Sequence, residues 1–320
     1  MTRAPALLTR PLWLGTLVSA LALLAAACAG GEKATTTPTL TPTVTGEGLV
    51  PEIVSTDLAV GPNNFSLGLL SEENEVILGA QVHLRFFQLV DDQAVFRGEG
   101  NARPVQVTLS FTETRPDGTT RTIETGQIAV YKANVEFDQP GPWAVEITAT
   151  LDGQSFEPAS VPFQVRERSL SPAIGDPAPK SRQTILADVG GDISKIDTSD
   201  PADPDMHAMT IAEAVTSGQS TLIVFATPAF CLSRTCGPTK QIVDQLYPTY
   251  KGQVNFIHVE PYFLDKVRSG EGLIPVPVME EWGLQTEPWV FVIDGQGNVA
   301  AKFEGVVAPQ ELEAAIQAVL

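Results

Sequence analysis

Apolar and polar residues alternate along much of the first half of the chain. The segments 105–111 and 161–165 carry apolar side chains at every second position, which places them on one face of an extended strand. Turn-forming residues at 115–118 and 139–142 separate such segments. Short strands of this kind with frequent turns between them predict an all-β sandwich over residues 51–168.

The pattern changes beyond a connector rich in Pro, Asp and Gly over residues 169–205. From 206 to 320, apolar runs of strand length alternate with segments in which apolar residues recur at helical spacing. Thr210 and Glu213 have the spacing of a capping box at the start of a short helix. This alternation predicts an α/β domain. The predicted strands are 221–226, 254–259, 289–293 and 299–303, and the predicted closing helix is 311–320.

The N-terminal segment has the pattern of a targeting signal. Arg3 and Arg10 form a positively charged region before the apolar run 12–27. This run has about the length of a signal-peptide core and is short for a membrane-spanning helix. Small residues lead directly to Cys28, and this arrangement resembles the lipobox of bacterial lipoproteins. The resemblance implies a signal peptide over 1–27, cleavage before Cys28 and lipidation of that cysteine.

The segment around Cys28 leaves one alternative open. The third residue before Cys28 is Ala25, where Leu is more usual, so ordinary secretory cleavage after Ala27 is the other interpretation. A linker rich in Thr and Pro follows over 28–50, and such tracts stay extended. We therefore expect a protein that is lipid-anchored at the extracytoplasmic face of the cell membrane.

The net charge of the chain disfavours some classes of binding partner. With 20 Lys and Arg against 38 Asp and Glu, the formal charge is −18 at pH 7. A surplus of carboxylates repels phosphate groups, which argues against nucleic acid and anionic lipid as partners. No sequence pattern predicts a cofactor, and no set of residues has the spacing of a known metal site.

Cys231 and Cys236 are the main candidates for chemistry. They lie directly after the apolar run 221–226 and directly before a helical pattern. A helix N-terminus stabilises a thiolate, which is the nucleophilic form of cysteine. Exported thiols tend to be oxidised, and lipidation of Cys28 would leave two cysteines. We therefore expect a Cys231–Cys236 disulfide in the resting state.

Local sequences in the C-terminal half resemble a known family. Cys231 ends the run Ile-Val-Phe-Ala-x-Pro-x-Phe-Cys, the segment 285–294 contains Glu-Pro-Trp-Val-Phe-Val-Ile-Asp, and Phe-Glu-Gly at 303–305 precedes the last helix. Together with Gly-x-x-Ala-Pro at 175–179, they are similar to extracytoplasmic thioredoxin-like thiol–disulfide oxidoreductases over about residues 174–320. The resemblance implies an α/β thioredoxin-like domain.

Two further expectations come from resemblances. In the oxidoreductase family a proline at the position of Pro288 follows a cis peptide bond, faces the disulfide and helps to position the substrate chain. The segment 137–147 contains Pro-Gly-Pro-Trp-Ala-Val and resembles a hairpin of immunoglobulin-like bacterial modules. The sandwich over 51–168 is therefore expected to be immunoglobulin-like, without the inter-sheet disulfide of antibody domains because it contains no cysteine.

The spacing of the cysteines departs from the family's pattern. The family has Cys-x-x-Cys, whereas this chain has Cys-x-x-x-x-Cys. Residues five apart on a helix point about 140° away from each other, so pairing requires 232–235 to be non-helical. Strand spacing makes Cys231 the nucleophile, while the Cys-Gly-Pro sequence makes Cys236 the thiol at the helix start. We favour Cys231 as the attacking thiol and Cys236 as the resolving thiol, with Arg234 able to lower either thiol pKa.

Several functions stay open at this point. The favoured one is thiol–disulfide exchange with the thiols or disulfides of exported proteins, which needs a membrane electron donor if the protein acts as a reductant. The cysteine spacing is also near that of Sco-type copper chaperones, since copper(I) favours thiolate and thioether ligands. For that alternative, His258 and the segment 206–209 (Met-His-Ala-Met) offer further ligands. A peroxidase and a non-enzymatic binding lipoprotein with a purely structural disulfide are the remaining alternatives.

Overall fold

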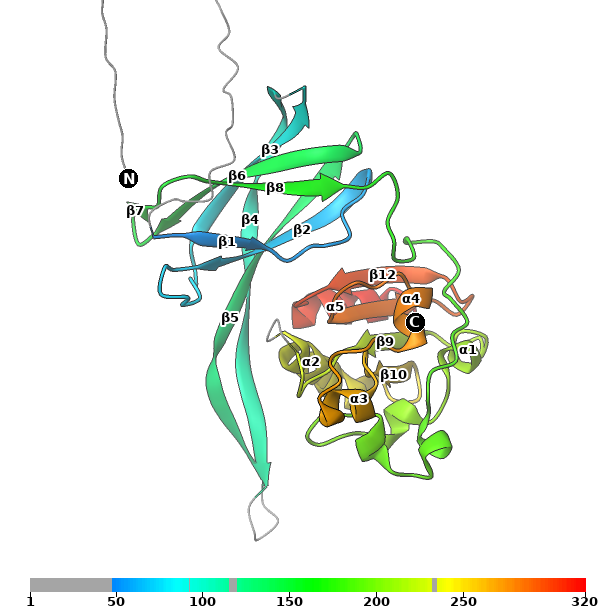
Figure 1. The fold of residues 1–320 in the computed structure, drawn as a ribbon. Coiled ribbons are helices and arrows are strands. Elements are labelled where there is room, and N and C mark those ends of the chain that lie inside the picture. The colour runs from blue at the N-terminus through cyan, green and yellow to red at the C-terminus, as the bar shows by residue number, and fades with distance from the viewer. Residues whose placement is uncertain (1–47, 92, 115–119, 232–234) are drawn as a thin grey trace, which may run out of the picture. The chain divides into compact units, whose positions relative to one another are not determined.

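The computed structural model describes residues 48–91, 93–114, 120–231 and 235–320. Within these residues the strands form two sheets, one of eight strands and one of four (Figure 1). No helix in this part of the chain is long and apolar enough to cross a membrane.

The eight-stranded sheet is antiparallel at every strand pair. Its order is β1-β2-β5-β4-β3-β6-β7, and β8 pairs with β6. The strands are β1 (Val50–Ile53), β2 (Gly61–Leu70), β3 (Gln81–Val90), β4 (Gln93–Thr114), β5 (Thr120–Phe137), β6 (Gly141–Leu151), β7 (Gln154–Ser155) and β8 (Ala159–Val165).

Strand β4 joins the two halves of this sheet. Its residues 93–102 pair with β3 and its residues 103–114 pair with β5, so one 22-residue strand belongs to both halves. Figure 1 shows β4 and β5 as the longest arrows of the fold. The result is one large sheet that nearly closes into a barrel, not two sheets packed face to face. The predicted immunoglobulin-like sandwich is therefore wrong, because the alternation of residues marked only short stretches of these long strands.

Aromatic side chains fill the core of the large sheet. The ring of Phe137 lies 4.9 Å from that of Trp143 and 5.8 Å from that of Phe86, both in edge-to-face contact. The buried Tyr131 hydroxyl donates to the carbonyl of Ile77 over 2.8 Å. These aromatic residues all belong to the buried core of the sheet.

The second sheet has the order β10-β9-β11-β12. β9 and β10 are parallel, whereas β11 runs antiparallel to both β9 and β12. Every side chain of β9 and β11 is buried, which explains their continuous apolar sequences. The strands are β9 (Thr221–Phe225), β10 (Asn255–Val259), β11 (Trp289–Ile293) and β12 (Val299–Glu304).

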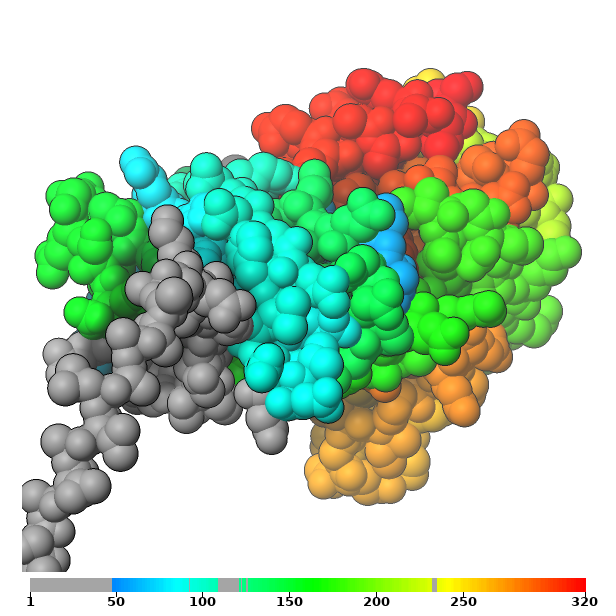
Figure 2. Space-filling view, turned by 90° about the horizontal axis from the view of Figure 1, so that it is seen from above, coloured from blue at the N-terminus to red at the C-terminus, as the bar shows by residue number. Residues whose placement is uncertain are grey.

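Helices and loops cover both faces of this sheet. Helices α2 (Cys236–Tyr250) and α5 (Pro309–Gln317) pack on the face that carries Val290, and Trp282 packs on the opposite face. Helix α5, drawn in red, lies at the surface in Figure 2. The remaining helices are α1 (Ile211–Ala214), α3 (Leu264–Ser269), α4 (Pro277–Glu281) and the 3-10 helices η1 (Leu186–Val189), η2 (Ile193–Lys195) and η3 (Pro204–His207).

The predicted α/β thioredoxin-like fold class is also wrong. The structure is 42% strand and 20% helix, so the protein is mostly β. Three of the five α-helices in the described residues contain only four to six residues. Sequence periodicity located β9 to β12 and the capping box of α1, but it does not set the length of a helix.

Candidate functional site

Strand β9 leads the chain into the cysteine pair. After β9, Ala226 and Thr227 are still fully buried. The amide of Phe230 donates to the carbonyl of Thr227 over 3.2 Å and closes a turn. Cys231 follows this turn and is partly exposed. A rigid buried strand therefore ends in a thiol that solvent can reach.

Cys236 is the first residue of helix α2, and its side chain is fully buried. Its backbone N–H donates to the Sγ atom of Cys231 over 3.2 Å. The two cysteines lie 2.6 Å apart, and no disulfide joins them in the structure. Arg234 lies outside the described residues. The structure thus brings the two predicted cysteines together, with Cys231 before the helix and Cys236 at its start.

The two thiols have different environments. Burial raises the pKa of the Cys236 thiol, and its hydrogen bond to Cys231 raises that pKa further. Cys236 therefore keeps its proton. The Sγ atom of Cys231 accepts an N–H group at the start of a 15-residue helix, where the helix dipole favours negative charge. A thiolate is thus favoured at Cys231 and a neutral thiol at Cys236.

A carboxyl group lies beside the pair. Glu287 has an oxygen within 4.8 Å of both sulfur atoms, and the Tyr262 hydroxyl donates to Glu287 Oε2 over 2.5 Å. Burial raises the pKa of Glu287, the Tyr262 hydrogen bond opposes that rise, and negative charge on Cys231 adds to it. A carboxyl group with a raised pKa is suited to accept and return a proton.

Pro288 is buried and follows Glu287 through a cis peptide bond, which confirms the cis geometry expected at this position. The carbonyl of Pro288 accepts the amide of Gly305 over 2.8 Å. The carbonyl of Gly305 in turn accepts the Thr239 hydroxyl of helix α2 over 3.2 Å. These two hydrogen bonds connect the start of β11 to the first turn of α2, which carries Cys236.

Other predicted residues are not part of this group. Cys28 lies outside the described residues, so its lipidation stays a prediction. The group of candidate ligand atoms that contains both cysteines is completed by Glu287 and includes neither His207 nor His258. The structure therefore gives the copper alternative no imidazole in that group.

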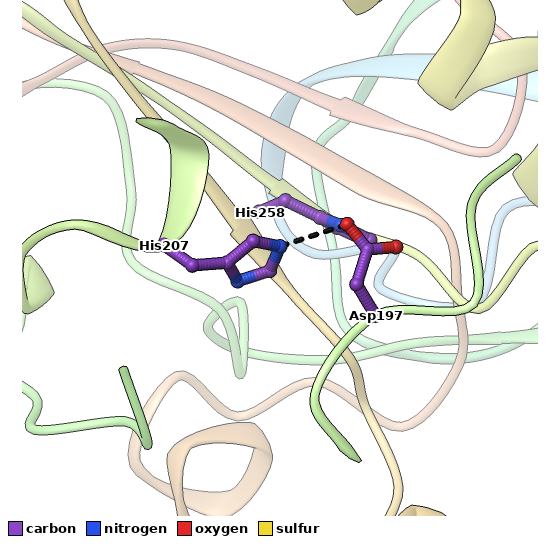
Figure 3. Close-up of side chains that lie close together, drawn as sticks. All are labelled: Asp197, His207 and His258. Carbon is purple, nitrogen blue, oxygen red and sulfur yellow. Dashed lines mark hydrogen bonds and ion pairs between the residues drawn. The ribbon is translucent and has the colours of Figure 1, made fainter. Parts of the chain in front are cut away.

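A second group of polar side chains lies in the interior of the same half of the chain. Asp197 follows η2, His207 ends η3 and His258 belongs to β10, and Figure 3 shows the three side chains converging. Asp197 Oδ2 lies 2.8 Å from His207 Nε2 and 3.2 Å from His258 Nδ1. None of the three residues is more than 4% exposed.

The charges in this second group are fixed by its surroundings. Burial by itself raises the pKa of Asp197, but the hydrogen bond from His207 and the adjacent His258 hold it far below its ordinary value. Asp197 is therefore ionised. Burial lowers the pKa of His207, which favours its neutral form.

Sequence reasoning missed this second group. The sequence offered His207, within the segment 206–209, and His258 only as further copper ligands for the cysteine pair, and Asp197 lies in a segment interpreted as a connector. One signal was available, since His258 interrupts an apolar strand and a buried polar side chain needs a partner. The identity of that partner depends on tertiary structure.

Comparisons with known proteins leave the family open. The chain matches no protein-family model and no curated protein. Its function has to be inferred from the two groups of side chains described above.

Proposed function

We propose that this protein carries out thiol–disulfide exchange on exported proteins through Cys231 and Cys236. The asymmetry of the pair supports this proposal most strongly, since a partly exposed cysteine accepts an N–H group beside a buried thiol. Attack on a disulfide needs an accessible thiolate, and release of the product needs a second thiol within reach of the first sulfur. The 2.6 Å separation of the cysteines satisfies the second requirement.

In the first step the Cys231 thiolate attacks one sulfur of a substrate disulfide. A bond forms between Cys231 Sγ and that sulfur, and the S–S bond of the substrate breaks. The other substrate sulfur leaves as a thiolate and takes up a proton from water. The N–H of Cys236 favours the attacking thiolate because it already points at the Cys231 sulfur.

In the second step Cys236 resolves the mixed disulfide. Its thiol proton passes to Glu287, whose carboxylate lies within 4.8 Å, and the Cys236 thiolate attacks Cys231 Sγ. The Cys231–Cys236 disulfide forms, and the bound substrate sulfur leaves as a thiolate that accepts a proton. Two electrons have then passed from the protein to its substrate. The same steps in reverse oxidise a substrate dithiol.

The location of this reaction is proposed from the sequence alone. Lipidation of Cys28 would hold the protein at the extracytoplasmic face of the membrane, where its substrates are exported proteins. A membrane electron donor would be needed to reduce the pair again after each reductive cycle. The Cys28→Ala variant tests the anchor, because it should move the protein from the membrane fraction to the soluble fraction. A variant that stays membrane-bound would reject lipid anchoring at Cys28.

The reduction potential of the pair tests the proposed chemistry. The Cys28→Ala chain is equilibrated in glutathione buffers of graded potential, quenched with an alkylating agent and analysed by mass spectrometry. We expect a two-electron transition above about −300 mV, because structural disulfides of secreted proteins have lower potentials. A potential below that value would identify an inert structural disulfide and would contradict exchange as the function.

A further inference from the structure

The two ring nitrogens of His258 have different surroundings. Nε2 lies 2.9 Å from the carbonyl oxygen of Ala226, which can only accept, so Nε2 carries a proton. In a neutral ring, Nδ1 then presents a lone pair. This Nδ1 atom is buried and makes no hydrogen bond with any described residue.

The lone pair of His258 Nδ1 faces the ionised Asp197 carboxylate, which also accepts the hydrogen bond of His207 Nε2. A metal ion bound to all three side chains replaces the proton on His207 Nε2. Asp197 Oδ2 lies 3.2 Å away, and His207 Nε2 approaches the same oxygen to 2.8 Å. In a buried site, a carboxylate oxygen and an imidazole lone pair repel each other unless a proton or a metal cation lies between them. The three atoms therefore form a natural position for positive charge (Figure 3).

The spacing and chemistry of these atoms fit a zinc ion. In a tetrahedral site with bonds of about 2.0–2.1 Å, ligand atoms lie about 3.3 Å apart. The distances from Asp197 Oδ2 to the two imidazole nitrogens are 2.8 and 3.2 Å, and all three atoms lie within 4.8 Å of one another. Two imidazole nitrogens and one carboxylate oxygen suit zinc, whereas calcium and magnesium prefer oxygen ligands.

The proposed ligands also form hydrogen bonds with neighbouring backbone groups, as ligands in metal sites do. The ring nitrogen of His258 that faces away from Asp197 donates to the Ala226 carbonyl, and Asp197 Oδ1 accepts the amide of Ser199 over 2.6 Å. In metal sites such bonds hold imidazole and carboxylate ligands in the orientation that the ion requires. They are already present here.

A pocket gives access to the two histidines. Its volume is about 550 Å³, and His207 and His258 both contribute to its lining. Arg182, Lys195 and Arg268 line the same pocket together with Glu260, Asp265 and Glu281, so charged and polar groups surround the space next to the histidines. The pocket therefore offers a route for an ion from solvent and room for a ligand that the protein does not supply.

We propose that Asp197, His207 and His258 bind one zinc ion, with water or a small anion from the pocket as the fourth ligand. Three protein ligands with an open fourth position are the arrangement of zinc sites that activate water or polarise a bound ligand. This site is separate from the cysteine pair and does not depend on the proposed exchange activity.

The test uses the full chain with Cys28→Ala, Cys231→Ser and Cys236→Ser, which removes all three cysteines, so that no thiol can bind zinc. After treatment with EDTA and dialysis, the chain is titrated with Zn²⁺ in a calorimeter. We expect one zinc per chain and a melting temperature that rises with zinc concentration. X-ray absorption of the loaded chain should show nitrogen and oxygen ligands at about 2.0–2.1 Å with imidazole scattering.

Single substitutions identify the ligands. His207→Gln and His258→Gln should each abolish stoichiometric binding, whereas His83→Gln should leave it unchanged. His83 is the matched control because it is the chain's third histidine and its side chain is 38% exposed.

Three results would overturn the proposal: no zinc binding by the cysteine-free chain, binding that survives both ligand substitutions, or an absorption spectrum without imidazole. The spectrum is recorded with all three histidines present, so it decides the question even if a variant fails to fold. Because the cysteine-free chain cannot perform exchange, failure here leaves the proposed function intact.

Discussion

Asp197→Ala removes the carboxylate on which two buried histidines converge. In the wild-type protein, Asp197 Oδ2 interacts with His207 Nε2 and Asp197 Oδ1 accepts the amide of Ser199. The Asp197 residue is only 4% exposed, so water cannot readily replace the lost oxygens. The substitution leaves His207, His258 and the Ser199 amide without their shared partner.

The size of the effect follows from these contacts. A hydrogen bond to a charged group contributes about 1.5–3 kcal/mol, so the loss of two such bonds costs at least about 3 kcal/mol. We therefore expect Asp197→Ala to lower the free energy of unfolding by at least about 3 kcal/mol.

Urea unfolding measured with EDTA present tests this value, because the chelator removes any contribution from a bound metal. The matched control is Asp192→Ala. Asp192 is exposed and lies 3.7 Å from Lys195 in a surface ion pair. The control should keep the wild-type midpoint. If Asp197→Ala moves the urea midpoint no further than Asp192→Ala does, the claim that the buried hydrogen bonds of Asp197 stabilise the fold is refuted.

Two further variants test the cysteine site and the backbone. Tyr262→Phe removes the hydrogen bond that opposes the rise in the Glu287 pKa, so Glu287 stays protonated to a higher pH. The exchange rate is measured from about pH 4 to 8, and the acid limb of its pH profile should move to higher pH by roughly one unit. An unchanged pH profile would exclude Glu287 as the proton acceptor. Gly283→Ala places a Cβ atom 2.1 Å from the carbonyl oxygen of Leu170 at a φ of +64°, so the free energy of unfolding should fall by about 2 kcal/mol or more. Gly175→Ala has a φ of +93° but no atom within 4 Å, and equal urea midpoints for the two variants would contradict the steric argument.

Local elements were predictable where near neighbours determine them. The capping box of α1 is confirmed, since the Glu213 amide donates to Thr210 Oγ1 while Glu213 Oε2 accepts the Thr210 amide. The apolar run of β9 is buried as its composition predicted. The large sheet was not predictable in the same way. Strand β4 changes partner between Ala102 and Arg103, from the strand before it to the strand after it, and no local residue pattern marks this change.

In the candidate sites, too, the sequence predicts contacts between residues that are near in the chain but not contacts between distant segments. Cys231 and Cys236 are close in sequence, so their proximity in space could be expected before the structure was known. The position of Glu287 beside them became visible only once β11 and α2 were placed. The Asp197 group depends on three separate segments, and no local pattern records their meeting.

A trapped mixed disulfide tests the central claim most directly. The Cys236→Ser variant, combined with Cys28→Ala, is incubated with a disulfide-bonded peptide from an exported protein and analysed by non-reducing mass spectrometry. Because attack by Cys231 remains and resolution by Cys236 is removed, we predict a stable peptide adduct on Cys231 that reductant releases. The matching Cys231→Ser variant should form far less adduct, since its remaining thiol is buried and has a raised pKa. Absence of an adduct in Cys236→Ser, or equal adducts in both variants, would contradict exchange led by Cys231.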